Sequence, residues 1–225
     1  MKRTFEPQQL TGDSNPLPRF PQLYEAALDE FSEKSWAQAS LNDILKRAGM
    51  SKGSLYHHFG DKFGLYLALM DVISKKKFEF FMPRLQGLSP GGDFFHTVKL
   101  ISREMMAFMF QDRRIYSLSG RLLVEEPSLL NRLIACFPGE KDLMMRALAE
   151  GAVRSGQIDA RFTPEFVHSM LEILFSNLHL LPGSAGTQEV FDQLELALDM
   201  IQYGLCGPRR ETGESTSPQP YDPLY

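Results

Sequence analysis

The hydrophobic positions of this chain repeat at helical spacing from residue 20 to residue 206. Residues 20–31 give the clearest example, because their apolar side chains follow the i, i+3, i+4, i+7 order of an amphipathic helix: Phe20, Leu23, Tyr24, Ala27, Leu28 and Phe31. The same pattern and its capping signals predict helices over residues 41–48, 52–59, 61–82, 93–111, 115–125, 127–136, 140–155, 164–181 and 187–206. The sequence shows no strand-type alternation of useful length, so we expect an all-α fold.

Residues 40–62 predict two short helices joined by a tight turn. Ser40 precedes the first helix and can cap its free N–H groups, and Ser51 stands in the same relation to the second. Gly49 lies between them, where the end of a helix commonly needs a left-handed residue. A helix, a short turn containing glycine and a second helix make a helix-turn-helix unit, whose second helix usually enters the major groove of DNA.

The second of these helices carries small, hydroxyl, aromatic and basic side chains. Leu55 and Phe59 are four residues apart and are expected to pack inward, which leaves Lys52 and Tyr56 on other faces. Gly53 costs about 1 kcal/mol of helix stability against alanine, and close approach to a duplex is the gain that would offset this cost. Taken alone, the pattern is equally consistent with an ordinary surface helix.

Residues 20–70 resemble the DNA-binding domain of TetR-type bacterial transcriptional regulators. The matching positions are Ala26, Ala27 and Phe31, then Ser40, Asp43 and Ile44, then residues 48–59 with the sequence AGMSKGSLYHHF, then Lys62 and Leu65. The resemblance implies an all-α protein with an N-terminal three-helix helix-turn-helix DNA-binding domain and a C-terminal helical ligand-binding and dimerisation domain. It also implies a dimeric working form, whose two-fold symmetry would match a palindromic operator.

The resemblance assigns DNA contacts residue by residue. Phosphate contacts fall on the start of the first helix of the unit, on the later part of the second, and on the start of the helix that follows. Base contacts fall on Asn42 of the first helix and on the first turn of the second, and His57 is a variable position that could add a contact. The residues so assigned are Ser40, Asn42, Lys52, Gly53, Ser54, Tyr56, His57, His58 and Lys62.

The last two predicted helices have apolar faces wider than one packing contact requires. They are either core helices or, as the resemblance implies, the pair that forms a four-helix bundle with its copy in a partner subunit. The second interpretation predicts a homodimer interface at Phe166, Met170, Leu174, Leu178, Leu194, Leu198, Ile201 and Leu205.

The middle of the chain is rich in Phe and Met, which can line an adaptable apolar pocket and can equally fill a core. Histidines in this region are candidate polar anchors for a ligand, although an isolated histidine is more often a hydrogen-bonded structural residue. The candidate effector contacts are His96, Met105, Phe108, Met109, Tyr116, Met145, His168 and Phe175.

The net charge, the length of the apolar runs and the number of cysteines limit the classes of protein to which this chain can belong. A net charge of −4 looks unfavourable for a DNA-binding protein, but residues 1–80 carry 11 basic and 10 acidic side chains, so the acidic excess lies in the rest of the chain. No apolar run reaches the roughly 18 residues of a membrane span, and no secretory signal is visible. With only Cys136 and Cys206, a disulfide framework or zinc site is not expected, and the sequence leaves a redox role for either open.

The expected organisation is a flexible N-terminal arm over 1–18, the DNA-binding domain over 19–64, an effector-binding and dimerisation domain over 65–206 and a disordered tail over 207–225. The sequence shows neither a nucleophile elbow nor a metalloprotease or phosphate-loop motif, so we expect no enzyme activity and no cofactor or metal. The hypothesis is a cytoplasmic homodimeric repressor that a small, largely apolar effector releases from double-stranded DNA. The alternative is a DNA-bound helical protein without a small-molecule effector, whose partner is another protein.

Overall fold

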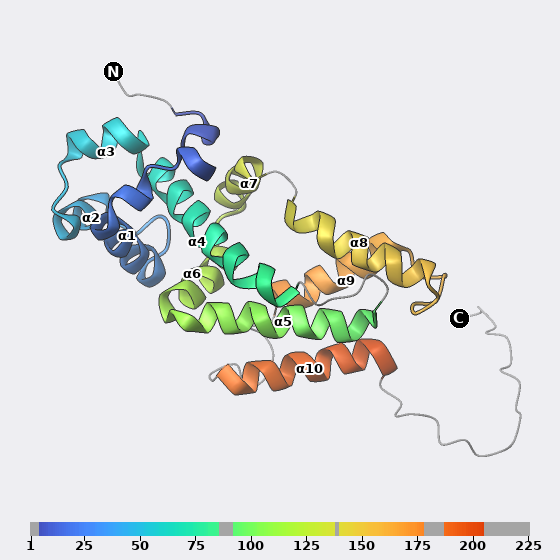
Figure 1. The fold of residues 1–225 in the computed structure, drawn as a ribbon. Coiled ribbons are helices and arrows are strands. Elements are labelled where there is room, and N and C mark those ends of the chain that lie inside the picture. Colours follow the sequence, from blue (N-terminus) through green and yellow to red (C-terminus); the bar gives the residue numbers. More distant parts are fainter. Residues whose placement is uncertain (1–4, 86–91, 138–139, 178–186, 205–225) are drawn as a thin grey trace, which may run out of the picture.

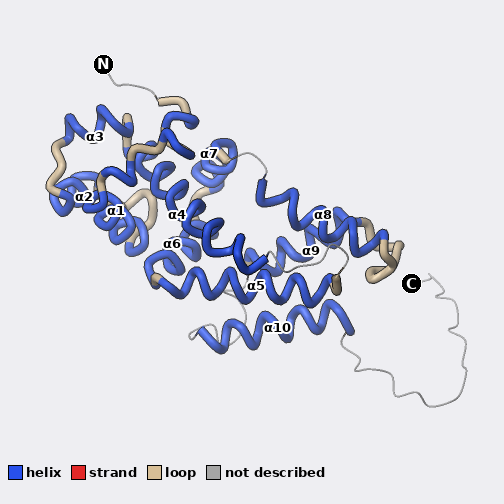
Figure 2. Tube along the Cα trace, in the orientation of Figure 1, coloured by secondary structure: helices blue, strands red, loops and turns tan. Residues whose placement is uncertain are grey.

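The computed structural model describes residues 5–85, 92–137, 140–177 and 187–204, and every regular element in these ranges is a helix (Figure 2). Three short 3-10 helices, Pro7–Gln9, Gly12–Ser14 and Leu17–Arg19, precede the α-helices α1 Pro21–Glu33, α2 Leu41–Ala48, α3 Lys52–Phe59, α4 Lys62–Leu85, α5 Phe94–Gln111, α6 Arg113–Val124, α7 Pro127–Cys136, α8 Glu140–Arg154, α9 Pro164–Ser176 and α10 Thr187–Tyr203. The all-α prediction is confirmed for these residues. The predicted tail over 207–225 lies outside them.

Helices α1, α2 and α3 gather at one end of the molecule, and α4 runs from them into its middle (Figure 1). Their apolar sides meet in one core, which includes Leu23, Ala27, Phe31, Ile44, Leu45, Leu55 and Phe59. Gly49 ends α2 with φ +63°, a conformation that side-chain-bearing residues rarely adopt. The chain then turns into Ser51, the residue that caps α3.

The N-terminal segment packs against α4, so the flexible arm predicted over 1–18 is wrong from residue 5 onward; residues 1–4 lie outside the described residues. Leu10 and Leu17 are 2% and 0% exposed. The side chain of Asn15 anchors the segment, because its N–H groups donate to the Asp71 carboxylate and to a backbone carbonyl of α4, each at 2.8 Å. Two buried leucines spaced among prolines produce no helical period, which is why the sequence pattern missed this packing.

Helix α4 extends past its predicted end. Pro83 was expected to stop the helix near Met82, but the helix continues to Leu85. Proline removes only one backbone donor here, and the turn is supported by the guanidinium of Arg84, which donates to the carbonyl oxygen of Phe80 at 2.8 Å.

A second apolar cluster lies at the opposite end of the molecule, where α5 and α10 lie side by side and α8 packs on α9 (Figure 1). Its buried members are Phe94, Val98, Ala149, Ala152, Leu171, Leu194 and Leu198. The two clusters are connected through Met145 and Leu148 of α8, which pack against both.

Helix α6 lies along α1 and fixes the N-terminal helices to the rest of the chain. At one end of the contact, Arg114 forms ion pairs with Glu25 and Asp29, each at 2.7 Å. Further along, the Nε–H of Arg121 donates to the carbonyl oxygen of Ser32 at 2.6 Å. Among the helices of the described ranges, none has the length and apolar character needed to cross a membrane.

Candidate nucleic-acid interface

Helix α3 buries one side and exposes the other. Leu55 and Phe59 are fully buried in the N-terminal core, as the sequence predicted. Lys52 and His57 are exposed, and Tyr56 is 40% exposed. An aromatic hydroxyl, a basic side chain and an imidazole therefore stand on the free face of a short helix.

The start of α3 has a bare backbone. The hydroxyl oxygen of Ser51 accepts a hydrogen bond from the N–H of Ser54 at 3.1 Å, which caps the helix. A Cβ added at Gly53 would meet a single atom within 4 Å, the Ser51 hydroxyl oxygen at 3.9 Å. Packing inside the protein therefore does not require glycine at this position, and the open surface leaves the backbone accessible to an outside partner.

The start of α2 lies in the same unit. The hydroxyl oxygen of Ser40 accepts from the N–H of Asp43 at 3.3 Å, so Ser40 caps α2 as predicted. Its hydroxyl proton remains available to a partner, because the cap uses only a lone pair. Asn42 is exposed on the first turn.

A buried carboxylate holds α1 and α2 together. Glu30 is 2% exposed, and its carboxylate accepts from Lys34 Nζ at 2.7 Å, from the backbone N–H of Ser40 at 2.7 Å and from the guanidinium of Arg47 at 2.5 Å. Burial alone raises the pKa of Glu30, but hydrogen bonds from Lys34 and Ser40 and the charges of Lys34 and Arg47 outweigh it, so the pKa lies below its ordinary value.

Glu30 is not among the functional residues expected from the sequence. A signal was present, because position 30 lies three residues after Ala27 and falls on the apolar side of the predicted helix. A carboxylate on an otherwise apolar face indicates a paired, buried charge.

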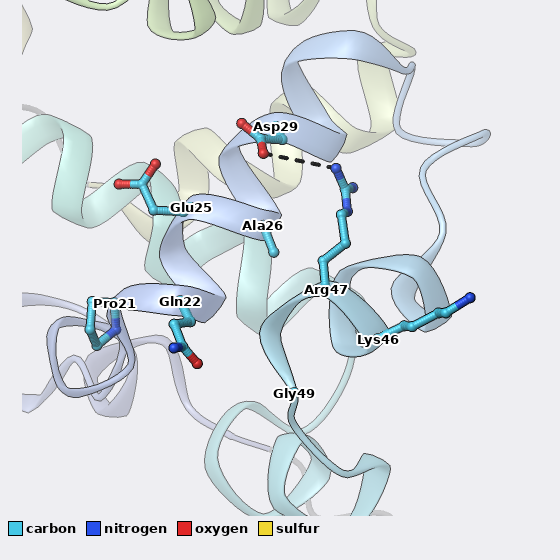
Figure 3. Close-up of a pocket in the computed structure, with 8 residues that line it drawn as sticks. All are labelled: Pro21, Gln22, Glu25, Ala26, Asp29, Lys46, Arg47 and Gly49. Carbon is cyan, nitrogen blue, oxygen red and sulfur yellow. Dashed lines mark ion pairs between the residues drawn. The ribbon is translucent and has the colours of Figure 1, made fainter.

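A surface pocket of about 510 Å³ lies beside this group, between α1 and α2. Figure 3 shows Arg47 reaching across from α2 toward Asp29, 3.9 Å away, while Lys46 extends away from the pair. Four of its eight lining residues carry a charge: Glu25, Asp29, Lys46 and Arg47. None of the candidate effector contacts lines this pocket.

His58 is turned partly inward. Its ring lies 4.9 Å from the ring of Phe20, the residue before α1, and 4.9 Å from that of His57. Desolvation lowers the pKa of His58, with smaller contributions from the charges of His57 and Arg19. The ring of His58 therefore packs the end of α3 against the start of α1, in addition to the phosphate contact assigned to it from the resemblance.

Lys62 occupies a different position from the one expected of a phosphate contact. Its ammonium donates to the carbonyl oxygen of Ala39 at 2.6 Å and to that of Trp36, and it lies 4.6 Å from the centre of the Trp36 ring. Burial lowers the pKa of Lys62, against the opposing charges of Glu30 and Glu125. Two of the three ammonium donors are used inside the protein, so Lys62 braces the loop between α1 and α2.

The eight candidate effector residues do not gather around one described cavity. Phe108 lines a pocket between α1, α4, α5 and α6, whereas the other seven line neither this pocket nor the one in Figure 3. His96 is exposed, and His168 is buried on α9. The remaining side chains pack on the apolar clusters or lie half-buried: Met105, Met109, Tyr116, Met145 and Phe175.

Two of the predicted dimer contacts are wrong. Leu194 and Leu198 are 2% and 0% exposed and pack within the chain's own second cluster, so they face α5 and not a partner. Leu174 packs partly against the same cluster. Phe166, Met170 and Ile201 are exposed, while Leu178 and Leu205 lie outside the described residues.

The exposed apolar face of α9 and α10 includes residues that the sequence pattern missed. It comprises Phe166, Met170 and Ile173 on α9 and Leu196, Met200 and Tyr203 on α10, each 37% exposed or more. The apolar pattern showed that both helices have apolar faces wider than one packing contact requires, but it did not show which side of α9 packs on α8 or which side of α10 packs on α5. We call these six side chains the outer face of α9 and α10.

In the described part of the chain, no group of three or more His, Cys, Asp or Glu side chains could hold a metal ion. Cys136 is partly exposed, and burial raises the pKa of its thiol against the nearby charge of Arg132.

Comparison with known proteins gives a family match over the N-terminal helices. Residues 23–69 match the model of bacterial regulatory proteins of the tetR family. The A-factor receptor protein of Streptomyces griseus is 36% identical over 74 residues, which is 32% of this chain and 27% of that protein. The transcriptional regulator BetI of Klebsiella pneumoniae is 37% identical over 70 residues, 31% of this chain and 36% of the relative. The transcriptional activator FasR of Mycolicibacterium smegmatis is 42% identical over 59 residues, 25% of this chain and 27% of the relative.

The matches to these relatives therefore span well under half of their length. The fold comparison reaches further. The crystal structure of a TetR family transcriptional regulator from Chloroflexus aurantiacus superposes with a TM-score of 0.63 over 84% of this chain and 94% of the other, at 22% identity. This likeness concerns the fold, and it extends beyond the N-terminal helices into the C-terminal half. Residues 23–69 of this chain thus match the N-terminal region of bacterial regulatory proteins of the tetR family, and they lie within a helical fold similar to that of a TetR family transcriptional regulator.

Proposed function

We propose that this chain binds double-stranded DNA as a homodimer and regulates transcription in the cytoplasm, with residues 19–64 as the DNA-binding domain. The observation that carries the proposal is the free face of α3, where Lys52, Tyr56 and His57 are exposed around Gly53, whose side is left open by every described residue but Ser51. A short helix with a bare first turn can approach base edges closely, as recognition helices in the major groove do.

The proposed DNA contacts fall into three groups: contacts to bases, contacts to the DNA backbone, and residues that position α3. Lys52, Gly53 and Ser54 meet base edges at the start of α3, and Tyr56 and His57 reach the backbone or the floor of the groove. On α2, the Ser40 hydroxyl and the exposed Asn42 amide face the neighbouring strand. His58 and Lys62 act in part through position, because their packing on Phe20 and on the α1–α2 loop sets the angle of α3.

The outer face of α9 and α10 is the proposed dimer surface. Six large apolar side chains are exposed on these two helices, three at helical spacing on each, and a partner surface would cover them. Pairing this face with its copy makes a four-helix bundle and gives a two-fold axis. The two α3 helices would then meet half-sites about 34–36 Å apart.

The finer part of the proposal is a repressor that a small, largely apolar effector releases from DNA. To move the population from 1:99 to 99:1, the effector must prefer the released conformation about 10⁴-fold. The rival proposal is a DNA-bound interaction protein without an effector. A thermal-shift screen with apolar compounds separates the two, since a ligand that binds the native state raises Tm, and an effector must also release the DNA.

Selection of binding sites from a random duplex library tests the central proposal. The full chain should enrich a palindromic sequence, with affinity that falls steeply as salt rises. The variants Lys52→Ala and Tyr56→Ala should enrich nothing while they keep their helical content. Lys75→Ala, on the exposed side of α4, is the matched control and should behave like the parent chain. Equal enrichment by all four proteins would refute the proposal.

A further inference from the structure

A second pocket of about 340 Å³ lies where the DNA-binding domain meets the rest of the chain, between α1, α4, α5 and α6. Tyr24, Phe108 and Ile115 line its inner side with 8%, 4% and 6% of their surface exposed, the half-buried ring of Phe80 stands beside them, and polar groups line much of the rest. A volume of this size suits a small organic molecule.

The rim of this pocket is acidic. Glu25, Glu79 and Asp112 line it. Arg114 forms ion pairs with two of these carboxylates, with Nη1–Oε2 and Nη2–Oδ2 distances of 2.7 Å to Glu25 and Asp112. Glu79 is exposed, and within the described part of the chain no cation lies within ion-pair distance of its carboxylate. The third acid is therefore open to a positive charge from outside.

The pocket already holds a cation that belongs to the chain. The ammonium of Lys76 lies 4.1 Å from the centre of the Tyr24 ring, in the geometry of a cation–π contact. Lys76 is exposed and joined to α4 by a flexible stem, so it can leave the ring without disturbing the fold. The Tyr24 ring face is thus a cation site that a mobile side chain occupies in the free protein.

We propose that this junction pocket binds a small organic ammonium with an aromatic or branched apolar body. The ammonium replaces that of Lys76 on the Tyr24 ring and faces Glu79, while the apolar body lies on Phe80, Phe108 and Ile115. Because Tyr24 belongs to α1 and the other walls to α4, α5 and α6, the bound molecule contacts both sides of the junction. Any consequence for DNA affinity rests on the proposed function, whereas the binding itself does not.

Calorimetric titration of the full chain with benzyltrimethylammonium chloride tests the proposal at constant ionic strength. Two partial probes accompany it: tetramethylammonium, which has the charge alone, and benzyl alcohol, which has the ring alone. We expect the complete probe to bind more tightly than either part. Equal affinity for tetramethylammonium would mean surface charge attraction only and would overturn the proposal.

Substitutions sharpen the test. Lys76→Met removes the internal competitor and should tighten binding by about twofold to thirtyfold, the range of a cation–π contact. A merely structural role for Lys76 predicts no gain. Lys75→Met, one residue away and 3.8 Å from Asp13, is the matched control and should leave the affinity unchanged.

Two further variants address the ring and the acid. Tyr24→Phe should keep the affinity because the ring face remains, and Glu79→Gln should weaken it. A chain that binds selected duplex but gives no binding heat even as the Lys76→Met variant refutes this inference alone. A chain that binds the probe but no duplex refutes the proposed function and leaves the pocket standing.

Discussion

Glu125, the residue that follows α6, accepts a hydrogen bond from the backbone N–H of Trp36 at 2.6 Å, across 89 positions of the sequence. Trp36 belongs to the loop between α1 and α2, and its ring contacts those of Phe31, Tyr66 and Phe63 with centroid distances of 6.0, 5.2 and 6.3 Å. The C-terminal end of α6 is therefore tied directly to the loop that leads into the helix-turn-helix unit.

Glu125→Ala should loosen this loop without unfolding the protein. A hydrogen bond to a charged group contributes about 1.5–3 kcal/mol, and the half-buried position of Glu125 favours the lower end. Hydrogen exchange should show faster exchange at the Trp36 amide, while amides in the second apolar cluster keep their protection. Trp36 is the single tryptophan, so its fluorescence reports the same loop. Unchanged protection at Trp36 would argue that the bond contributes little in solution.

Gly53→Ala should separate stability from DNA binding. Nothing in the protein opposes a Cβ at this position, and alanine is the better helix former by about 1 kcal/mol. The variant should therefore melt at the same or a higher temperature, yet bind its selected duplex at least tenfold more weakly, since the methyl group would lie between the backbone and the bases. An affinity equal to that of the parent would place the α3 backbone away from DNA.

The sequence predicted α3 more accurately than the contacts around it. The inward positions of Leu55 and Phe59 followed from local periodicity alone, and so did the two serine caps. Lys62 contacts the α1–α2 loop at Ala39, 23 positions away, and Glu30 contacts Arg47, 17 positions away. The spacing of residues along one helix carries no information on such contacts.

The same limit explains the dimer residues. Leu194 and Ile201 belong to one apolar helix, but only packing against α5 decides which is buried. For the N-terminal segment, the prolines led to a prediction of disorder. The structure shows instead that the buried side chains of Leu10 and Leu17 anchor this segment.

Glu30→Gln should remove a pH-dependent part of the stability. The folded pKa of Glu30 lies below its unfolded value, so the ionised side chain stabilises the folded state fully above the unfolded pKa. That contribution is lost as pH falls through the folded pKa. Urea unfolding at several pH values should show the parent more stable than Glu30→Gln near neutrality, with the gap narrowing below about pH 4.3, the ordinary glutamate pKa. A gap that is constant with pH would mean that the charge of Glu30 is not what stabilises the contact.

The outer face of α9 and α10 can be tested against the buried face of the same helices. Ile173→Glu places a charge on a side chain that is 57% exposed, so the protomer should fold normally, but a paired interface would have to bury that charge. Sedimentation should therefore show a dimer for the parent and a monomer for Ile173→Glu. Leu196→Glu on α10, at 61% exposure, should act in the same way.

Leu194→Ala is the contrasting variant: it removes a side chain from the intramolecular cluster and should cost about 2–5 kcal/mol of unfolding free energy. At temperatures where Leu194→Ala remains folded, it should still sediment as a dimer. A dimer that survives both glutamate substitutions would move the interface away from this face, and with it the spacing proposed for the two α3 helices.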